Sequence, residues 1–451
     1  MNKAILIMII IIGSSISAVP AKEISSSHKL NTQLTGKVSI TDLAVIAYES
    51  NPAIFAAREG WRAQIEKYNI STSYPDPQFM VTYFPEPIET RLGPQDWNAN
   101  ISQMIPFPGK LSKAGEVIQA DARMGKLNLD KTIRDVMVSI SKSYHELLYI
   151  QQAKKIAAKN ADLLEQLRTM GESAYAQDRA AFLDVVKSQS QAAQLRYDII
   201  LLDELEQTEK TRINGLLNRD PDSPVGNFKP VNVEPVLYKL DELYRMAEIN
   251  QEEIRMADLA IKKAEAQSDL AVYQNLPNFK LGIFYAGIGE SEMDIPDSGK
   301  DAVGVQFGMN IPIWFGKNTS KLNAAKAMIR KSKAARTVRV NNTRTQIHTL
   351  FFKLQNAMRL MTLYKDEMLP QAINAMKTSE TWFREGQGSF SDFVETQGAA
   401  YNFQLSLARA RADYGKTLAG LEQMTGLSLT KKILTKKPVT KKIEEDTGGI
   451  K

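Results

Sequence analysis

The chain has 451 residues, no cysteine and a formal charge of +6 at pH 7. The lack of cysteine excludes disulfide bonds and a lipid carried on a cysteine, so stability must come from packing. Much of the excess charge lies from Lys431 onward, where seven lysines accompany three acids, and such a basic end is usually a solvated tail. The charge therefore gives no support for a nucleic-acid partner.

The N-terminus predicts an export signal over residues 1–21. One basic residue, Lys3, precedes an apolar run from Ala4 to Ile12, and small residues lead to Ala21. The run is too short for a membrane-spanning helix, which needs about 20 apolar residues. We therefore expect the chain to be exported and the signal to be removed.

The rest of the chain is predicted to contain one unit twice. Its period of about 200 residues is far longer than the roughly 20 to 50 residues of solenoid repeats, which indicates two domain-sized modules packed side by side. We assign residues 37–225 to the first structural repeat, 236–429 to the second, and 430–451 to a lysine-rich disordered tail. Three motifs recur: Asp76-Pro77-Gln78-Phe79 as Leu276-Pro277-Asn278-Phe279, Ile105-Pro106-Phe107-Pro108-Gly109-Lys110 as Ile311-Pro312-Ile313-Trp314-Phe315-Gly316-Lys317, and Phe182-Leu183-Asp184-Val185-Val186-Lys187-Ser188-Gln189 as Phe390-Ser391-Asp392-Phe393-Val394-Glu395-Thr396-Gln397.

The first repeat is predicted to begin with a helix that nearby prolines stop. Two strands of alternating apolar and polar residues follow at about 78–84 and 97–105, with a proline-rich loop at 85–94 between them. A helix then runs without a strong breaker over about 111–170. A hairpin tip at about 168–184, with Gly171 at the bend, leads to a returning antiparallel helix.

The second repeat is predicted to follow the same order. Its strands lie at about 278–286 and 302–311, and its hairpin tip lies at about 384–392, with Gly386 and Gly388 at the bend. The predicted fold class is therefore mainly α with a small β part, in which long antiparallel coiled-coil helices carry four strands per chain.

The four strands pose a closure problem. Each has one apolar and one polar face, yet a closed barrel needs about eight strands, and an open sheet cannot span a membrane. Two chains would supply eight strands and a filled interior, whereas three would supply twelve strands and a water-filled pore. A soluble helical protein with a β subdomain is the alternative. The polar residues expected to line a lumen, which favour three chains, are Gly304, Gln306, Gly308 and Asn310.

The chain resembles the TolC-like outer-membrane efflux channels over about residues 37–429. The resemblance rests on the duplicated helix-strand-strand-helix order, on the run from Ser102 to Lys110 where strand passes into helix, and on the paired hairpin-tip motifs. Within that run, Pro106 to Lys110 also resembles the branch associated with divalent metal cation efflux.

The resemblance implies a homotrimer in the outer membrane of a Gram-negative-type cell, with outer-membrane lipid around a twelve-stranded transmembrane β-barrel. A helical extension would cross the periplasm and dock, through a periplasmic adaptor (membrane fusion) protein, onto an inner-membrane pump such as an RND transporter. The chain would then be a passive export duct.

The second hairpin tip carries the candidate aperture. Asp392 and Glu395 are three residues apart on one helix face, so a trimer would concentrate six acids there and attract cations. The resembled family has acidic aperture residues at these positions, but it usually has a basic residue where Gly388 stands. Closure is therefore assigned to Arg384, Lys187 or Asp184. An ordinary solvated helix face is the alternative.

The same tips carry the candidate adaptor contacts, because a groove between helical hairpins suits helical recognition. Hairpin capping and core packing are equally good explanations of these residues. The candidates are Gly171, Phe182, Gly386, Gly388 and Phe390.

Catalysis finds little support in the sequence. His28, His145 and His348 are the only histidines, and none lies in a ligand cluster or near a nucleophile motif. No phosphate-binding loop is present, so we expect no enzyme activity, no cofactor and no metal site, and energy must come from a partner. The alternatives to an efflux duct are a periplasmic coiled-coil scaffold or adaptor, and a duct for type I protein secretion. The cargo, whether metal cations, drugs or a protein, stays open.

Overall fold

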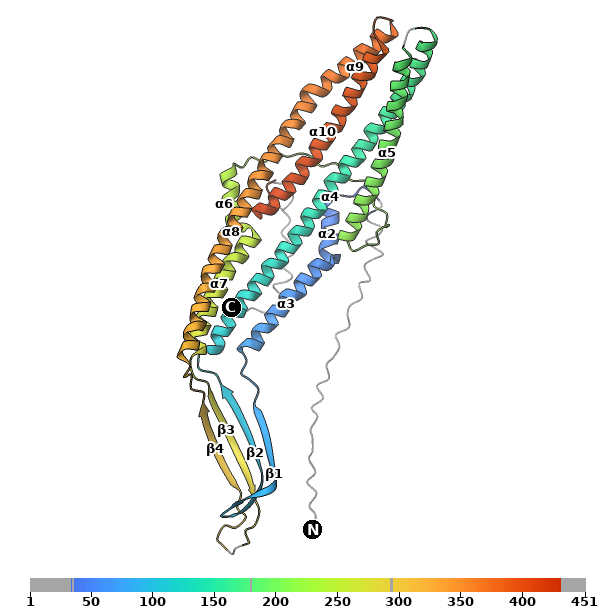
Figure 1. Ribbon diagram of the computed structural model, residues 1–451. Helices are drawn as coiled ribbons and strands as arrows, with labels where there is room; N and C mark the ends of the chain where they lie inside the picture. The colour runs from blue at the N-terminus through green and yellow to red at the C-terminus, as the bar shows by residue number, and fades with distance from the viewer. Residues whose placement is uncertain (1–33, 35, 179–180, 293–294, 431–451) are drawn as a thin grey trace.

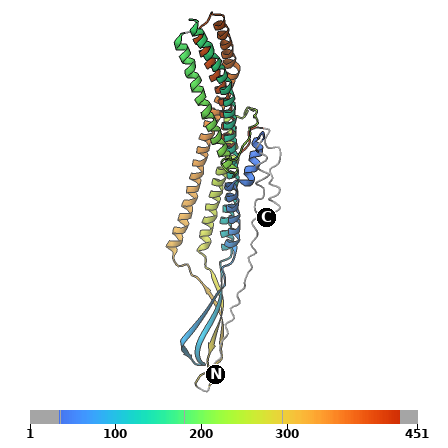
Figure 2. The same ribbon diagram turned by 90° about the vertical axis from the view of Figure 1, so that its right-hand side faces the viewer.

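The computed structural model describes residues 34, 36–178, 181–292 and 295–430. The predicted signal peptide and the tail beyond residue 430 lie outside these ranges. The molecule is elongated, with a four-stranded sheet at one end and two helical hairpin tips at the other (Figure 1). A view from the side shows the same long body, with the helices continuing the direction of the strands (Figure 2). The mainly α fold with a small sheet is confirmed.

The first repeat begins with two helices where the sequence predicted one. Asn51 ends the first helix, and its side chain accepts hydrogen bonds from the backbone N–H groups of Ala53 (2.9 Å) and Ile54 (3.3 Å), which caps the second. Pro52 starts the second helix, where its missing N–H group is not needed. The elements are α2 (Ile40–Ser50), α3 (Pro52–Thr72), β1 (Gln78–Thr90), β2 (Gly93–Ile105), α4 (Lys110–Ala176) and α5 (Phe182–Leu216).

The second repeat follows the same order with one irregularity. The long helix that matches α4 is divided by a π-helical turn, η1, into α8 and α9. The elements are α6 (Leu240–Asn250), α7 (Glu252–Gln274), β3 (Phe279–Ile288), β4 (Ala302–Met309), α8 (Phe315–Thr362), η1 (Leu363–Met368), α9 (Leu369–Arg384) and α10 (Phe390–Thr425).

The sheet has the order β1-β2-β3-β4, and all neighbours are antiparallel. The loop expected at 85–94 is instead strand and a tight turn, because β1 continues to Thr90 and pairs with β2 from Gly93. The register shifts between Tyr83 and Ile88, where two prolines lie. Proline is tolerated there because β1 is an edge strand and its outward N–H groups need no partner in the sheet. Strand β4 ends at Met309, two residues earlier than predicted.

In the part of the chain that the structure describes, three buried apolar clusters spaced along the molecule hold the helices together. One lies where α2, α3 and α4 meet, and another where α6, α8 and α10 meet. The third packs the two hairpins against each other near their tips. The chain reverses between Ala176 and Phe182 and between Arg384 and Phe390. Among the helices in the described ranges, none is long and apolar enough to cross a membrane.

Candidate functional site

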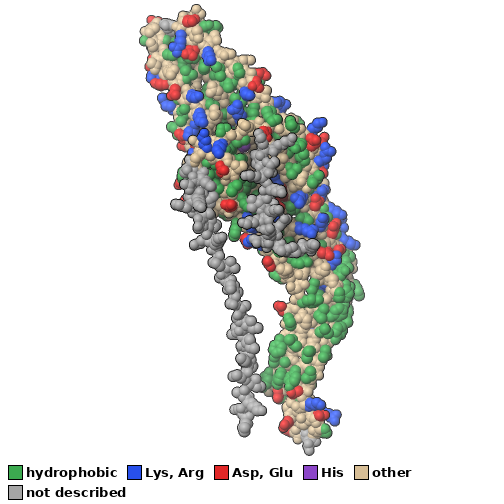
Figure 3. Space-filling view, turned by 180° about the vertical axis from the view of Figure 1, so that it is seen from behind, with side chains coloured by type: hydrophobic (Ala, Val, Ile, Leu, Met, Phe, Trp, Pro, Cys, Tyr) green, Lys and Arg blue, Asp and Glu red, His purple; other side chains and the backbone are tan. Residues whose placement is uncertain are grey.

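The sheet presents one face of exposed apolar side chains. Across all four strands, Phe79 is paired with Ile101, Ile101 with Ile283, and Ile283 with Val305. Val305 is 80% exposed. Figure 3 shows an apolar band over the strands, with charged residues concentrated above and below it. An exposed apolar surface of this extent marks an interaction with a membrane or a protein.

The other face of the sheet is polar and carries the predicted lumen residues. Asn100 on β2 donates a hydrogen bond from Nδ2 to Oε1 of Gln306 on β4 (2.6 Å), so the two side chains reach over β3. Gly304 leaves space for the ring of Phe284, which lies where a Cβ atom would be, whereas Gly308 has open space beside Lys280. Of the predicted lumen residues, Gly304, Gln306 and Gly308 lie on this face, together with Phe284, which the sequence analysis did not include.

Asn310 lies just beyond β4 and extends its pairing with the neighbouring strand. Its backbone N–H donates to the carbonyl oxygen of Asn278 (3.2 Å), and its side-chain oxygen accepts from the backbone N–H of Asn278. The side chain is therefore used to hold the end of the sheet together.

The base of the sheet is joined to the helices by Lys110. Its ammonium group donates to the carbonyl oxygen of Leu276 (3.1 Å) and to Oδ1 of Asn278 (2.7 Å). Gly109 has φ +88° and lies against the ring of Tyr273, so a side chain there would be strained and crowded. The sequence showed a Gly-Lys pair after each strand pair but gave Lys110 no role.

The second hairpin tip brings the two predicted aperture acids together on α10. Ser389 caps this helix by accepting a hydrogen bond from the backbone N–H of Asp392 (3.0 Å), and both Asp392 and Glu395 are exposed. Arg384 instead forms an ion pair with Glu380 of its own helix (2.8 Å). Lys187 is exposed on α5, and the side chain of Asp184 is outside the described atoms.

The predicted adaptor residues differ sharply in exposure. Gly171 lies inside α4 rather than at the bend, and its Cα faces the ring of Phe390, which is 1% exposed and contacts Phe383 at 5.2 Å between ring centroids. Phe182, by contrast, is 64% exposed beside Tyr175. The exposed aromatic side chain is the one available to a partner.

Both glycines of the second bend shape the reversal. Gly386 has φ +76°, a conformation that favours glycine, and it ends α9. Gly388 donates its backbone N–H to the carbonyl oxygen of Trp382 (3.0 Å) and lies close to the Trp382 side chain. They therefore define the shape of the tip directly.

A partly buried histidine lies where α4 meets α10. His145 faces Gly415, and burial, with a smaller effect from Lys416, lowers the pKa of His145 to about 4. Its imidazole is therefore neutral at pH 7. In the described ranges no three His, Asp or Glu side chains are grouped as metal ligands would be.

Comparison with known proteins relates this arrangement to channels. Residues 243–427 match the family model described as outer membrane efflux protein. No curated protein matches the chain. Among solved structures, VceC from Vibrio cholerae has a TM-score of 0.72 at 16% identity, over 87% of this chain and 97% of that one. The open-state MtrE channel from Neisseria gonorrhoeae has a TM-score of 0.71 at 15% identity, over 87% and 89%. CmeC from Campylobacter jejuni has a TM-score of 0.69 at 11% identity, over 90% and 89%.

Proposed function

We propose that the chain is a member of the outer membrane efflux protein family and the passive duct of a tripartite efflux system, because its second repeat matches the model of that family and its fold is similar to that of solved outer-membrane channels. Proteins of this family are channels rather than enzymes, and they are trimers that work with adaptor proteins and inner-membrane pumps. The chain is an outer-membrane protein whose helices extend into the periplasm. A periplasmic scaffold would have no use for the exposed apolar face of the sheet.

The observation that carries the proposal is the two-faced sheet with two free edges. Within the described ranges, strands β1 and β4 each have one side without a strand partner. In a bilayer those backbone groups must be paired, so β4 of one copy would join β1 of the next. Three copies close a twelve-stranded barrel with the apolar band toward lipid and the face of Asn100 and Gln306 toward water.

A pair of substitutions on β4 tests the barrel. Val305→Lys places a charge on the lipid side, where it should destabilise the inserted state by about 2 to 4 kcal/mol near the midplane. Gly308→Lys places the same charge in the open space on the other face and should be tolerated. The readout is the fraction of heat-modifiable trimer recovered from outer membranes. Equal tolerance at both positions would rule out this orientation of the sheet.

We infer a cationic cargo from the acids at the tip. Asp392 and Glu395 are exposed, and rings of carboxylates at a constriction favour cations. We therefore favour metal cations and cationic drugs over an exported protein as the cargo. Because Arg384 is paired with Glu380, we assign closure of the resting aperture to the packing of the tips and to Lys187, rather than to an Arg384 link between hairpins.

The adaptor would meet the same end of the molecule. The exposed Phe182 and Tyr175 lie at the first tip, and the glycine bend at 386–388 lies at the second. A helical hairpin of an adaptor would pack against these tips, as helices pack into grooves between other helices. Gly171 and Phe390 would support this surface from inside.

Channel recordings in planar bilayers test the aperture. Asp392→Asn combined with Glu395→Gln removes six charges per trimer at nearly constant size, and we expect lower cation selectivity and weaker block by multivalent cations. The control variant, Asp162→Asn with Glu367→Gln, removes as many charges farther along the hairpins and should leave both properties unchanged. If the tip variant behaves like the control, the acids do not line a constriction.

A further inference from the structure

Matching positions in the two repeats differ in residue number by one of two constant values. Positions 200 apart correspond in α3 and α7, since Asn51 and Gln251 each accept a hydrogen bond from the backbone N–H three residues on. Positions 207 apart correspond in α4 and α8, where the fully buried Ile140 matches the fully buried Ile347. The same offset also matches other buried positions, namely Val136 with Thr343, Leu147 with Leu354, and Ile150 with Ala357.

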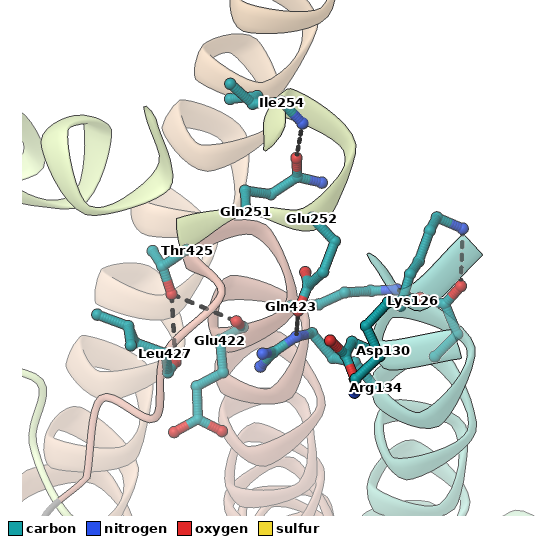
Figure 4. Close-up of polar contacts among 12 residues, drawn as sticks. Lys126, Asp130, Arg134, Gln251, Glu252, Ile254, Glu422, Gln423, Thr425 and Leu427 are labelled. Carbon is teal, nitrogen blue, oxygen red and sulfur yellow. Dashed lines mark hydrogen bonds and ion pairs between the residues drawn. The ribbon is translucent and has the colours of Figure 1, made fainter. Parts of the chain in front are cut away.

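Inside the chain, the first repeat packs on the second through α4 and α7. This contact, which we call the inner seam, contains four ion pairs spread along the two helices. Figure 4 shows one of them, Arg134 with Glu252, beside the end of α10. The four pairs are Lys113–Asp269 (3.5 Å), Asp121–Lys263 (2.7 Å), Lys131–Glu253 (3.6 Å) and Arg134–Glu252 (2.7 Å).

The two matching helices, α8 and α3, have no extensive contact with each other in the described chain. The strands behave alike: β2 pairs with β3 inside the chain, while the matching strands β4 and β1 are the free edges. The surface of α8 that corresponds to the α7-facing side of α4 is consequently open. Met328 is 45% exposed and Val338 is 58% exposed.

The eight positions that match the four ion pairs are all uncharged. At every pair, both matching residues are uncharged. If the two helices packed together, no charge on one would therefore face a neutral residue on the other. In the order of the ion pairs above, the matching residues are Ser320 with Asn69, Met328 with Ala63, Val338 with Ala53, and Asn341 with Pro52.

We propose that α8 of one copy packs on α3 of the next in the geometry of the inner seam, so that these four neutral pairs face each other. We call this contact the outer seam. A charged residue on only one side would be desolvated without a partner, so joint replacement on both sides is what a real contact requires. The two helix surfaces of the inner seam then match each other by charge, and the two surfaces of the outer seam match each other by being neutral. A charged surface does not match a neutral one, and this difference specifies which surfaces pair during assembly.

The outer seam rests on the trimer proposed above, and cross-linking can test the two separately. The chain contains no cysteine, so paired cysteines can be introduced without background. In Ala53→Cys with Val338→Cys, a short bis-methanethiosulfonate reagent should link neighbouring copies and yield covalent dimers and trimers on denaturing gels. The matched inner-seam variant, Lys131→Cys with Glu253→Cys, should link only within one chain.

An out-of-register control completes the experiment. Ala53→Cys with Ser320→Cys moves one cysteine by about 27 Å along α8 and should give no covalent trimer. If native mass measurement shows trimers but Ala53→Cys with Val338→Cys links no copies, the outer seam is wrong while the trimer stands. If the unmodified protein is not a trimer at all, the proposed duct itself fails.

A charge transplant tests the chemistry of the outer seam. Met328→Asp or Ala63→Lys alone should weaken the trimer, because each buries one unpaired charge. The two together recreate the Asp121–Lys263 pair between copies, and should restore trimer stability at low salt and make it newly sensitive to salt. The readout is the temperature at which trimers dissociate on gels. A double variant that is as weak as the sum of the two single ones would overturn the assigned contact.

Discussion

The two repeats have the same order of elements but differ in the structure of their long helix. In the first, α4 runs for 67 residues without interruption, whereas the second follows the same path through α8, η1 and α9. Before η1, buried residues match at an offset of 207, as in Ile140 and Ile347; after it they match at 208, as in Gly171 and Ser379. A π turn accommodates one extra residue, so the second repeat gained a residue without turning its buried face away from the core.

Equivalent positions in the two repeats also meet different surroundings. Phe182 and Phe390 both begin a returning helix, yet the first is exposed and the second is buried against α4 of the other repeat. Duplication therefore preserves the helix pattern, while the neighbour across the interface decides what each residue does. This contrast can be sharpened by changing matched positions in pairs.

The largest effect is expected from single-residue deletions. Removing Lys155 from α4 would rotate the rest of that helix by about 100°, which takes Leu164 and Leu167 out of the hairpin core, where each is worth about 2 to 5 kcal/mol. Removing Lys365 from η1 should convert the π turn to α-helix and cost less than about 1 kcal/mol. Urea unfolding followed by circular dichroism measures both. Similar losses would mean that η1 does not hold an extra residue.

Substitution of the matching residues Phe390 and Phe182 should show the next largest difference in stability. Phe390→Ala removes a fully buried ring from between Gly171 and Phe383, and we expect a loss of about 3 to 5 kcal/mol in the free energy of unfolding. Phe182→Ala should cost less than about 1 kcal/mol, because its ring is exposed. The same urea experiment applies. A large loss at Phe182 would mean that a neighbouring copy buries it.

His145 should make stability depend on pH, whereas Phe352, the matching residue of the second repeat, cannot. The pKa of His145 is about 4 in the folded state against about 6.5 when unfolded, so the unfolded state binds the proton first as pH falls. The contribution of His145 to the free energy of unfolding is therefore complete above pH 6.5. It declines by up to about 3 kcal/mol as the pH falls from 6.5 to 4.

His145→Phe tests this dependence with His348→Phe as its control. Urea midpoints at pH 7.5 and 4.5 should differ less in His145→Phe than in the parent protein. The exposed His348 should be replaceable without altering the difference. An unchanged pH dependence in His145→Phe would show that other groups cause it.

The helix caps should give the smallest effect. Ser39 and Asp42 form a complete capping box at α2, whereas the matching Lys239 and Glu242 supply only the bond from the backbone N–H of Lys239 to Glu242 (2.7 Å). Ser39→Ala should destabilise by about 1 kcal/mol, and Lys239→Ser should stabilise by several tenths. Thermal unfolding of the two variants should therefore shift in opposite directions. Two shifts of the same sign would contradict the capping argument.

The predicted fold followed from patterns that act over a few residues. Alternation marked the strands, the 3.6-residue period marked the long helices, and the recurring motifs marked the duplication, so the helix-strand-strand-helix order was correct. The predicted loop at 85–94 was wrong because proline excludes a central strand but not an edge strand. Which strand is an edge depends on pairing with residues far away in the sequence.

The candidate sites divide in the same way. Asp392 and Glu395 share a face because three residues span most of a helical turn, and this needs no tertiary structure. Gly171 was placed at a bend because glycine serves turns and close helix contacts equally well; only the ring of Phe390 against it shows which applies.

The sequence by itself determined that this protein is a duplicated chain with long helices and four two-faced strands, because each of these features is written in local periodicity or in an internal repeat. The tertiary structure decided which of two equivalent residues is buried, where the extra residue of the second repeat is absorbed, and which ion pairs join the repeats. These depend on the surface that each helix meets, and that surface comes from residues more than a hundred positions away.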